Sequence, residues 1–151
     1  MDRACIFITG AGRGIGSSTA RLFAERGWFV GASDLEEEGL LELEKEFGSE
    51  RVWTCKLDVT ELAEFERSLE SFGAATNGRL DLLHNNAGIL FGGALDTLDP
   101  SIDAKILNVN LLGVLNGFRA GLPLLRQTPG SLCFSTASSG AIRGVSGLAV
   151  Y

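Results

Sequence analysis

Residues 6–16, Ile-Phe-Ile-Thr-Gly-Ala-Gly-Arg-Gly-Ile-Gly, constrain the fold of this chain more than any other stretch. The apolar start is typical of a strand buried on both faces of a parallel sheet. Gly10, Gly12, Gly14 and Gly16 then lead into a segment with the apolar spacing of a helix. Backbone N–H groups in a turn without side chains can approach a diphosphate closely, and a helix N-terminus adds partial positive charge. The stretch therefore predicts a turn that holds a nucleotide pyrophosphate, although an ordinary strand-to-helix turn is an alternative.

An acidic residue follows the second predicted strand. Residues 27–33 are predicted as that strand, and Asp34 ends it, 18 residues after Gly16. In a dinucleotide fold, a carboxylate at this place accepts hydrogen bonds from the adenosine ribose and would repel the extra phosphate of NADP. Asp34 could also cap the helix that follows, and the two roles are compatible.

Strand and helix patterns alternate along the whole chain. The strands are predicted at residues 4–8, 27–33, 51–57, 80–84 and 131–135. Right-handed crossovers between them predict an α/β, Rossmann-type doubly wound parallel sheet in the strand order 3-2-1-4-5. Its ligand crevice would lie at the carboxyl ends of the strands.

Small and polar residues stand at two of these strand ends. Asp58 and Val59 follow the third strand, where Asp58 would lie beside an adenine or would instead stabilise a turn. Asn86, Ala87 and Gly88 follow the fourth strand and suit a tight passage beside a cofactor. These residues are therefore predicted to border the ligand crevice.

The single histidine and the three cysteines lie in predicted strands. Because His84 lies within a strand, we interpret it as a satisfied structural histidine, with a catalytic role as the alternative. We interpret Cys5, Cys55 and Cys133 as reduced core residues, because their spacing matches no metal-binding pattern. No metal site is expected.

Asp99 and Pro100 predict the start of a helix that runs to about Leu122, with Pro123 near its end. Apolar residues line two faces of this helix, so one face would cover the sheet and the other would meet a second subunit. Asn110 is polar among them and could be a buried structural amide or a site residue.

Composition narrows the class of protein. The 151 residues, 45% of them apolar, are enough for one domain with a core. A net charge of −6 argues against a nucleic-acid partner. The apolar stretches are too short to span a membrane, and the N-terminus lacks the pattern of a signal peptide, so a cytoplasmic protein is expected.

Several motifs together resemble the classical short-chain dehydrogenase/reductase family. They are Thr9-Gly10-Ala11-Gly12-Arg13-Gly14-Ile15-Gly16, Asp34, Asp58-Val59, Asn85-Asn86-Ala87-Gly88, Asn108-Val109-Asn110, and Ser138 placed 13 residues before Tyr151. The resemblance covers the whole chain. It implies an oxidoreductase that transfers a hydride between NAD(H) and a small-molecule secondary alcohol or ketone.

The resemblance also implies a role for each matching residue. Tyr151 would be the general acid and base, Ser138 would orient the substrate oxygen, and Asn110 would help to hold a proton-relay water. The cofactor would be bound by Gly10, Gly12, Arg13, Gly14, Ile15, Gly16, Asp34, Asp58, Val59, Asn86, Ala87 and Gly88.

The sequence departs from the family at Tyr151, because the Tyr-x-x-x-Lys signature stops there. A phenol has a pKa of about 10 and is a poor base at neutral pH without a nearby cation. We therefore expect residues 1–151 to be one dinucleotide-binding domain, C-terminally truncated, without the last helix and strands of the fold and inactive alone. A natural short form is an alternative. The full-length protein would be a homodimer or homotetramer.

Two residues give opposite signals for the cofactor. Arg13 lies where NADP-preferring members often carry a basic residue, whereas Asp34 lies where NAD-preferring members carry an acid. We predict NAD, because an exposed arginine contributes little while a like-charge clash near the ribose is costly.

The competing functions are a non-catalytic nucleotide-binding or interaction module and a methyltransferase-like nucleotide binder. Residues 85–88 and the Ser138 and Tyr151 pair argue against the methyltransferase.

Overall fold

The computed structural model describes residues 3–151 and contains a five-stranded sheet in the order β3-β2-β1-β4-β5. All neighbouring strands are parallel. The strands are β1 (Cys5–Thr9), β2 (Phe29–Asp34), β3 (Val52–Lys56), β4 (Leu82–Asn85) and β5 (Leu132–Ser135). The predicted fold class and strand order are confirmed, and every predicted strand end lies within two residues of the observed one.

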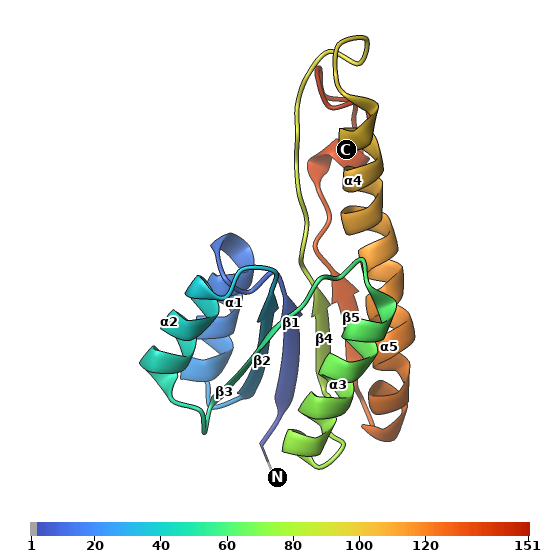
Figure 1. Cartoon of the computed structure of the whole chain (residues 1–151). Coiled ribbons are helices and arrows are strands. Elements are labelled where there is room, and N and C mark those ends of the chain that lie inside the picture. Colours follow the sequence, from blue (N-terminus) through green and yellow to red (C-terminus); the bar gives the residue numbers. More distant parts are fainter. Residues whose placement is uncertain (1–2) are drawn as a thin grey trace.

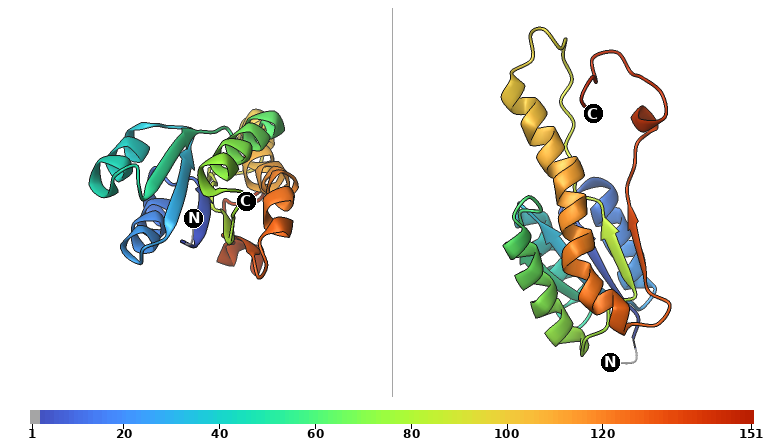
Figure 2. Two further views of the ribbon diagram at one scale, coloured as in Figure 1. Left: turned by 90° about the horizontal axis from the view of Figure 1, so that it is seen from below. Right: turned by 90° about the vertical axis from the view of Figure 1, so that its right-hand side faces the viewer.

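Helices cover both faces of the sheet. Viewed from below, α1 (Gly14–Glu25) and α2 (Glu38–Phe47) lie on one side of it (Figure 2). On the other side, α3 (Leu62–Thr76) packs against α5 (Gly113–Gln127). The helix α4 (Pro100–Leu107) rises beyond the carboxyl ends of the strands (Figure 1). The result is the three-layer arrangement of a doubly wound fold.

The side chains of the central strand β1 contribute to both hydrophobic cores, one on each face of the sheet. Side chains alternate between the faces of a strand, and all five residues of β1 are buried. Ile6 and Ile8 belong to the core beneath α1 and α2. Phe7 points to the opposite core, where its ring meets Phe65 and Phe72 of α3 with centroids 6.2 and 5.3 Å away. A strand without a polar face is thereby fixed at the centre of the sheet.

The long helical segment differs from its predicted end. Asp99 caps α4 as expected, because its carboxylate accepts a hydrogen bond from the Ser101 N–H at 2.8 Å. A π-helical segment, Asn108–Leu112, then joins α4 to α5. The prediction that the helix ends near Leu122 is wrong, since α5 continues through Pro123 to Gln127. Leu124 and Leu125 pack against the core beside α3, and this packing offsets the hydrogen bond that proline cannot donate.

The two apolar faces of this segment have different surroundings. Ile106 and Gly113 are buried on the inner face. On the outer face, Leu107, Leu111 and Phe118 are 48%, 58% and 39% exposed.

Among residues 3–151, no helix is both long and apolar enough to cross a bilayer.

Candidate nucleotide-binding and catalytic site

The glycine-rich turn joins β1 to α1 at the carboxyl end of the sheet. Gly10 and Gly14 have φ angles of +66° and +57°, a region that glycine adopts without steric cost. A Cβ atom on Gly10 would lie 2.8 Å from the Cα of Ala87, and one on Gly16 would collide with the carbonyl oxygen of Gly10. The spacing of these glycines is therefore required by the close contact between the turn, helix α1 and the end of β4.

The N-terminus of α1 is open to a ligand. Within residues 3–151, no side chain caps this helix, and its first turn carries no acidic residue. The first backbone N–H groups of a helix have no acceptor within the helix itself. The side chain of Ile15 in the same turn is 64% exposed although it is apolar. A helix end of this kind can bind an anion, and here an apolar residue lies beside it.

Asp34 is fixed against the glycine-rich turn. Its Oδ2 accepts a hydrogen bond from the Gly12 N–H at 2.9 Å, and its Oδ1 accepts one from the Glu36 N–H at 3.1 Å. Glu37 occupies the N-cap position of α2, so the alternative that Asp34 caps this helix is wrong. The intervening residues place Asp34 in a turn before the helix. Asp34 thus ends β2, as the sequence predicted, and its carboxylate is held at the edge of the turn.

Hydrogen bonds join the ends of β1 and β4. The Thr9 hydroxyl accepts hydrogen bonds from the Asn86 and Ala87 N–H groups, both at 3.0 Å. The Asn86 side-chain amide donates to the carbonyl oxygens of Thr9 and Gly10 at 3.1 and 3.2 Å. Sequence reasoning did not single out Thr9 as a site residue. Its signal was a hydroxyl at the end of an otherwise apolar strand.

The loop after β3 is held from two directions. Asp58 Oδ1 accepts hydrogen bonds from the Thr60 N–H and hydroxyl at 2.9 and 2.8 Å, so the turn role left open for Asp58 is observed. The Asn116 amide on α5 donates to the carbonyl oxygens of Val59 and Thr60 at 2.9 and 3.1 Å. Sequence reasoning also missed Asn116. The feature that could have indicated it is a polar residue on the buried face of an amphipathic helix.

Asn110 lies in the π-helical segment and binds the loop that follows Gly88. Its Oδ1 accepts a hydrogen bond from the Ile89 N–H, and its Nδ2 donates to the Ile89 carbonyl oxygen, both at 2.9 Å. The Asn110 amide therefore has a structural role, one of the two alternatives that the sequence left open. Single π-helical turns inside helices occur frequently at functional sites.

Ser138 and Tyr151 both lie beside Gly140. The Ser138 hydroxyl accepts a hydrogen bond from the Gly140 N–H at 3.1 Å. A Cβ atom on Gly140 would lie 3.5 Å from both Ser138 Oγ and Tyr151 Cδ1. A hydrogen bond of 2.9 Å from the Gly93 N–H to the Gly147 carbonyl oxygen joins this segment to the loop after β4. The segment that follows β5 and ends at Tyr151 extends beyond the carboxyl ends of the strands (Figure 1).

His84 and the three cysteines lie in strands, as predicted. His84 is 3% exposed and stacks on Phe134 with ring centroids 4.3 Å apart, and burial lowers its pKa. Cys5, Cys55 and Cys133 lie in strands as free thiols, and burial raises the pKa of each to about 11. Among residues 3–151, no group of histidine, cysteine and acidic side chains could hold a metal ion.

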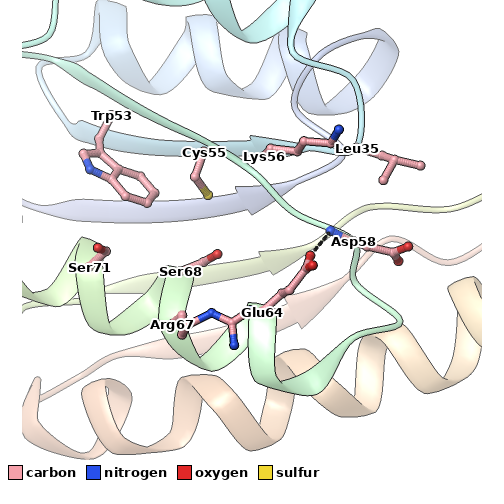
Figure 3. A pocket seen from close by; sticks show the side chains of 9 residues that line it. All are labelled: Leu35, Trp53, Cys55, Lys56, Asp58, Glu64, Arg67, Ser68 and Ser71. Atoms are coloured by element: carbon pink, nitrogen blue, oxygen red, sulfur yellow. Dashed lines mark hydrogen bonds between the residues drawn. The ribbon is translucent and has the colours of Figure 1, made fainter.

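A groove lies beside this edge of the site, between β3 and α3 (Figure 3). Its volume is about 580 Å³, and the Glu64 carboxylate within it accepts a hydrogen bond from the Asp58 N–H at 3.1 Å. The groove includes none of the glycines of the turn. Its lining residues are Leu35, Trp53, Cys55, Lys56, Asp58, Glu64, Arg67, Ser68 and Ser71.

Comparisons with known proteins identify the family. The family model described as short chain dehydrogenase matches residues 4–151. The chain is 37% identical to the short-chain dehydrogenase reductase ATA1 of Arabidopsis thaliana, over 93% of this chain and 51% of that protein. It is 32% identical to meso-2,3-butanediol dehydrogenase of Serratia marcescens, over 100% of this chain and 59% of that protein. The chain belongs to the short-chain dehydrogenase family, and spans a little over half the length of these relatives.

Solved structures agree with this assignment. A short-chain dehydrogenase/reductase from Burkholderia phymatum in complex with NAD has a TM-score of 0.93 and 28% identity, over 99% of this chain and 54% of that one. An alcohol dehydrogenase from Thermococcus sibiricus, complexed with 5-hydroxy-NADP, has a TM-score of 0.92 and 27% identity, over 99% of this chain and 64% of that one. Similar structures thus hold either NAD or 5-hydroxy-NADP.

Proposed function

We propose that the whole protein is an NAD-dependent oxidoreductase that interconverts a secondary alcohol and a ketone. The observation that carries this proposal is the open N-terminus of α1 beside an Asp34 carboxylate already fixed by the Gly12 N–H. The turn offers backbone N–H groups to a pyrophosphate, and Asp34 offers oxygen acceptors to a ribose. Membership of an oxidoreductase family supports the enzyme over the non-catalytic module.

The residues around the turn fit such a dinucleotide. Gly10, Gly12, Arg13, Gly14, Ile15 and Gly16 would surround its pyrophosphate, while Asp34, Asp58 and Val59 would hold its adenosine end. Asn86, Ala87 and Gly88 would border the nicotinamide end, because β4 ends beside β1 at the centre of the sheet. When bound, the nicotinamide would exchange a hydride with the substrate carbon.

Ser138 and Tyr151 would handle the proton at the substrate oxygen. In the direction of reduction, the Tyr151 hydroxyl would give its proton to the oxygen, and in oxidation it would take the proton back. The Ser138 hydroxyl would donate a hydrogen bond to the same oxygen and orient it. Asn110 would help to hold the water through which the proton reaches solvent. The proximity of Ser138 and Tyr151 around Gly140 supports this division of roles.

The geometry of Asp34 supports NAD over NADP. A phosphate on the ribose 2′ oxygen would meet a carboxylate that the Gly12 and Glu36 N–H groups restrain. Arg13 is exposed, so pairing with that phosphate would be screened and worth only about 0–1 kcal/mol. A repulsion of about 1.4–2.8 kcal/mol would make NADP binding about 10- to 100-fold weaker. The repulsion by Asp34 is therefore expected to exceed the attraction by Arg13 in the binding free energy of NADP.

Calorimetric titration of the whole protein with NAD and NADP tests this function. We expect the wild type to bind NAD more tightly, and Asp34→Ala to narrow or reverse the preference. Glu42→Ala is the matched control, because it removes an exposed carboxylate of α2 that is not among the site residues and should leave both affinities within about twofold. Tighter binding of NADP than of NAD by the wild type would contradict the cofactor assignment.

We also infer that residues 1–151 form one dinucleotide-binding domain, and that the exposed outer face of α4 and α5 joins two copies in a homodimer or homotetramer. Leu107, Leu111 and Phe118 lie along that face. An exposed apolar stripe of this kind is typical of an interface, and the same stripe on a second copy would match it. A cytoplasmic location stays a prediction.

A further inference from the structure

A chain of hydrogen bonds begins at the buried side chain of His84. Its Nε2 lies 2.9 Å from the hydroxyl oxygen of Thr136, which follows β5. Its Nδ1 is buried and has no hydrogen-bond partner among residues 3–151. The stacking on Phe134 holds the plane of the ring. The imidazole thus has one polar contact, and that contact leads out of β4 toward the site.

The chain continues from Thr136 to the glycine-rich turn. The Thr136 hydroxyl lies 2.9 Å from Asn86 Oδ1. The amide nitrogen of Asn86 faces the carbonyl oxygens of Thr9 and Gly10, which are acceptors only. This orients the amide, so Asn86 Oδ1 must accept from Thr136.

The direction of every hydrogen bond follows from this orientation. A hydroxyl carries one proton, and Thr136 uses it on Asn86. The Thr136 oxygen must therefore accept from His84, whose Nε2 carries the ring proton while Nδ1 is bare. Burial lowers the pKa of His84 and favours this neutral ring.

We propose that His84 is a positioning residue for the cofactor turn. By donating from Nε2 to Thr136, it keeps the Thr136 hydroxyl directed at Asn86, and the Asn86 amide then holds the carbonyl groups of Thr9 and Gly10. The position of the turn is sensitive to this amide, because Gly10 already lies against the backbone of Ala87. The consequence for affinity rests on the proposed function, in which this turn binds a dinucleotide.

Three substitutions of His84 test the proposal in the whole protein. The side-chain nitrogen of His84→Gln can reach the position of Nε2 and restore the donor. The shorter His84→Asn places its nitrogen nearer to Nδ1, and His84→Leu has no donor at all. We expect NAD affinity to fall about 3- to 10-fold for Asn and Leu, the loss typical of one hydrogen bond, and to stay within about 2-fold for Gln. Equal affinities of the Asn, Leu and Gln variants would overturn the proposal.

Thr136 provides the second test, because His84 is proposed to act through its hydroxyl. Thr136→Val should weaken NAD binding about as much as His84→Leu, whereas Thr136→Ser should bind as the wild type does. Once Thr136 is valine, adding His84→Leu should change affinity less than about 2-fold. Independent, multiplying losses would instead show that His84 acts only by packing against Phe134. If His84→Leu does not fold, the Gln and Asn pair carries the same comparison.

Nitrogen NMR of the His84 ring separates this inference from the proposed function. The ring signals, assigned by their loss in His84→Gln, should show a protonated Nε2 and a bare Nδ1. A proton on Nδ1 would overturn the inference even if the protein binds NAD. A wild type that binds neither dinucleotide would overturn the proposed function instead. In that case the Asn86 side-chain amide signals decide, since they should shift in His84→Leu and remain in His84→Gln.

Discussion

The Thr9 hydroxyl offers the sharpest test of how β1 and β4 are joined. It is 2% exposed and accepts two backbone hydrogen bonds at 3.0 Å, from Asn86 and Ala87. Thr9→Val keeps the shape of the side chain but leaves both N–H groups without this acceptor. Each partly buried group that loses its partner costs about 1–2 kcal/mol, so we expect a loss of about 2–4 kcal/mol. This is a large part of the roughly 5–15 kcal/mol that stabilises a typical domain.

Urea unfolding of the whole protein, followed by tryptophan fluorescence, measures this loss. The control is Thr9→Ser, which keeps the hydroxyl and removes one methyl group at a cost of about 1 kcal/mol. Valine should therefore be clearly worse than serine, although it is the more apolar residue in a buried strand. If Thr9→Val proved as stable as Thr9→Ser, the two hydrogen bonds would not hold these strand ends together, and the reasoning would be refuted.

Three further predictions concern the whole protein. Tyr151→Phe should abolish turnover and leave NAD affinity within about twofold, because it removes a proton donor away from the glycine-rich turn. Ser138→Ala should also lower turnover strongly. Steady-state kinetics with a panel of secondary alcohols measures both, and a Phe variant with normal turnover would contradict the role of Tyr151. Leu115→Asp should dissociate the assembly in light scattering without unfolding it, because this α5 side chain is 41% exposed, and an unchanged mass would show that the outer face is no interface. Burial disfavours the charged form of Asp81, but hydrogen bonds from Arg79 and a backbone N–H outweigh this and lower its pKa. The lowered pKa means that the ionised carboxylate stabilises the fold above the unfolded pKa of about 3.9 and that this contribution is lost as pH falls through the folded value. The urea midpoint of unfolding should therefore fall less between neutral and acidic pH in Asp81→Asn than in the wild type. An equal fall in both proteins would contradict this role of the Asp81 carboxylate.

The sheet could be predicted because its strands are local patterns. β1 and β2 are almost wholly buried, so their residues form short apolar runs bounded by glycine or acid. The alternation of strands and helices implied right-handed crossovers in a parallel sheet, and 3-2-1-4-5 was the simplest strand order for it. The end of α5 was missed because Pro123 is a local signal for a helix end, whereas Leu124 and Leu125 keep the helix through contacts with a distant core.

The candidate site was only partly predictable. The glycines and Asp34 could be placed because each lies at the end of a strand, and strand ends meet at one edge of a parallel sheet. The capping alternative for Asp34 was wrong because α2 begins only after Glu37, its N-cap residue, and because Asp34 Oδ2 accepts a hydrogen bond from Gly12, 22 residues earlier in the sequence. Thr136 was one of several small residues after β5, and nothing in the local sequence distinguished its contact with His84.

The sequence by itself therefore determined the fold class, the strand order and the family, because these depend on periodicity, handedness and short motifs. Only the tertiary structure decided which polar atoms meet. Thr9 and Asn86 are 77 residues apart, and His84 and Thr136 are 52 apart, yet each pair lies within 3.0 Å. A hydrogen bond depends on distances of a few tenths of an ångström and on the direction of one proton. Such distances are set by the packing of the whole sheet and its helices, which no local pattern specifies.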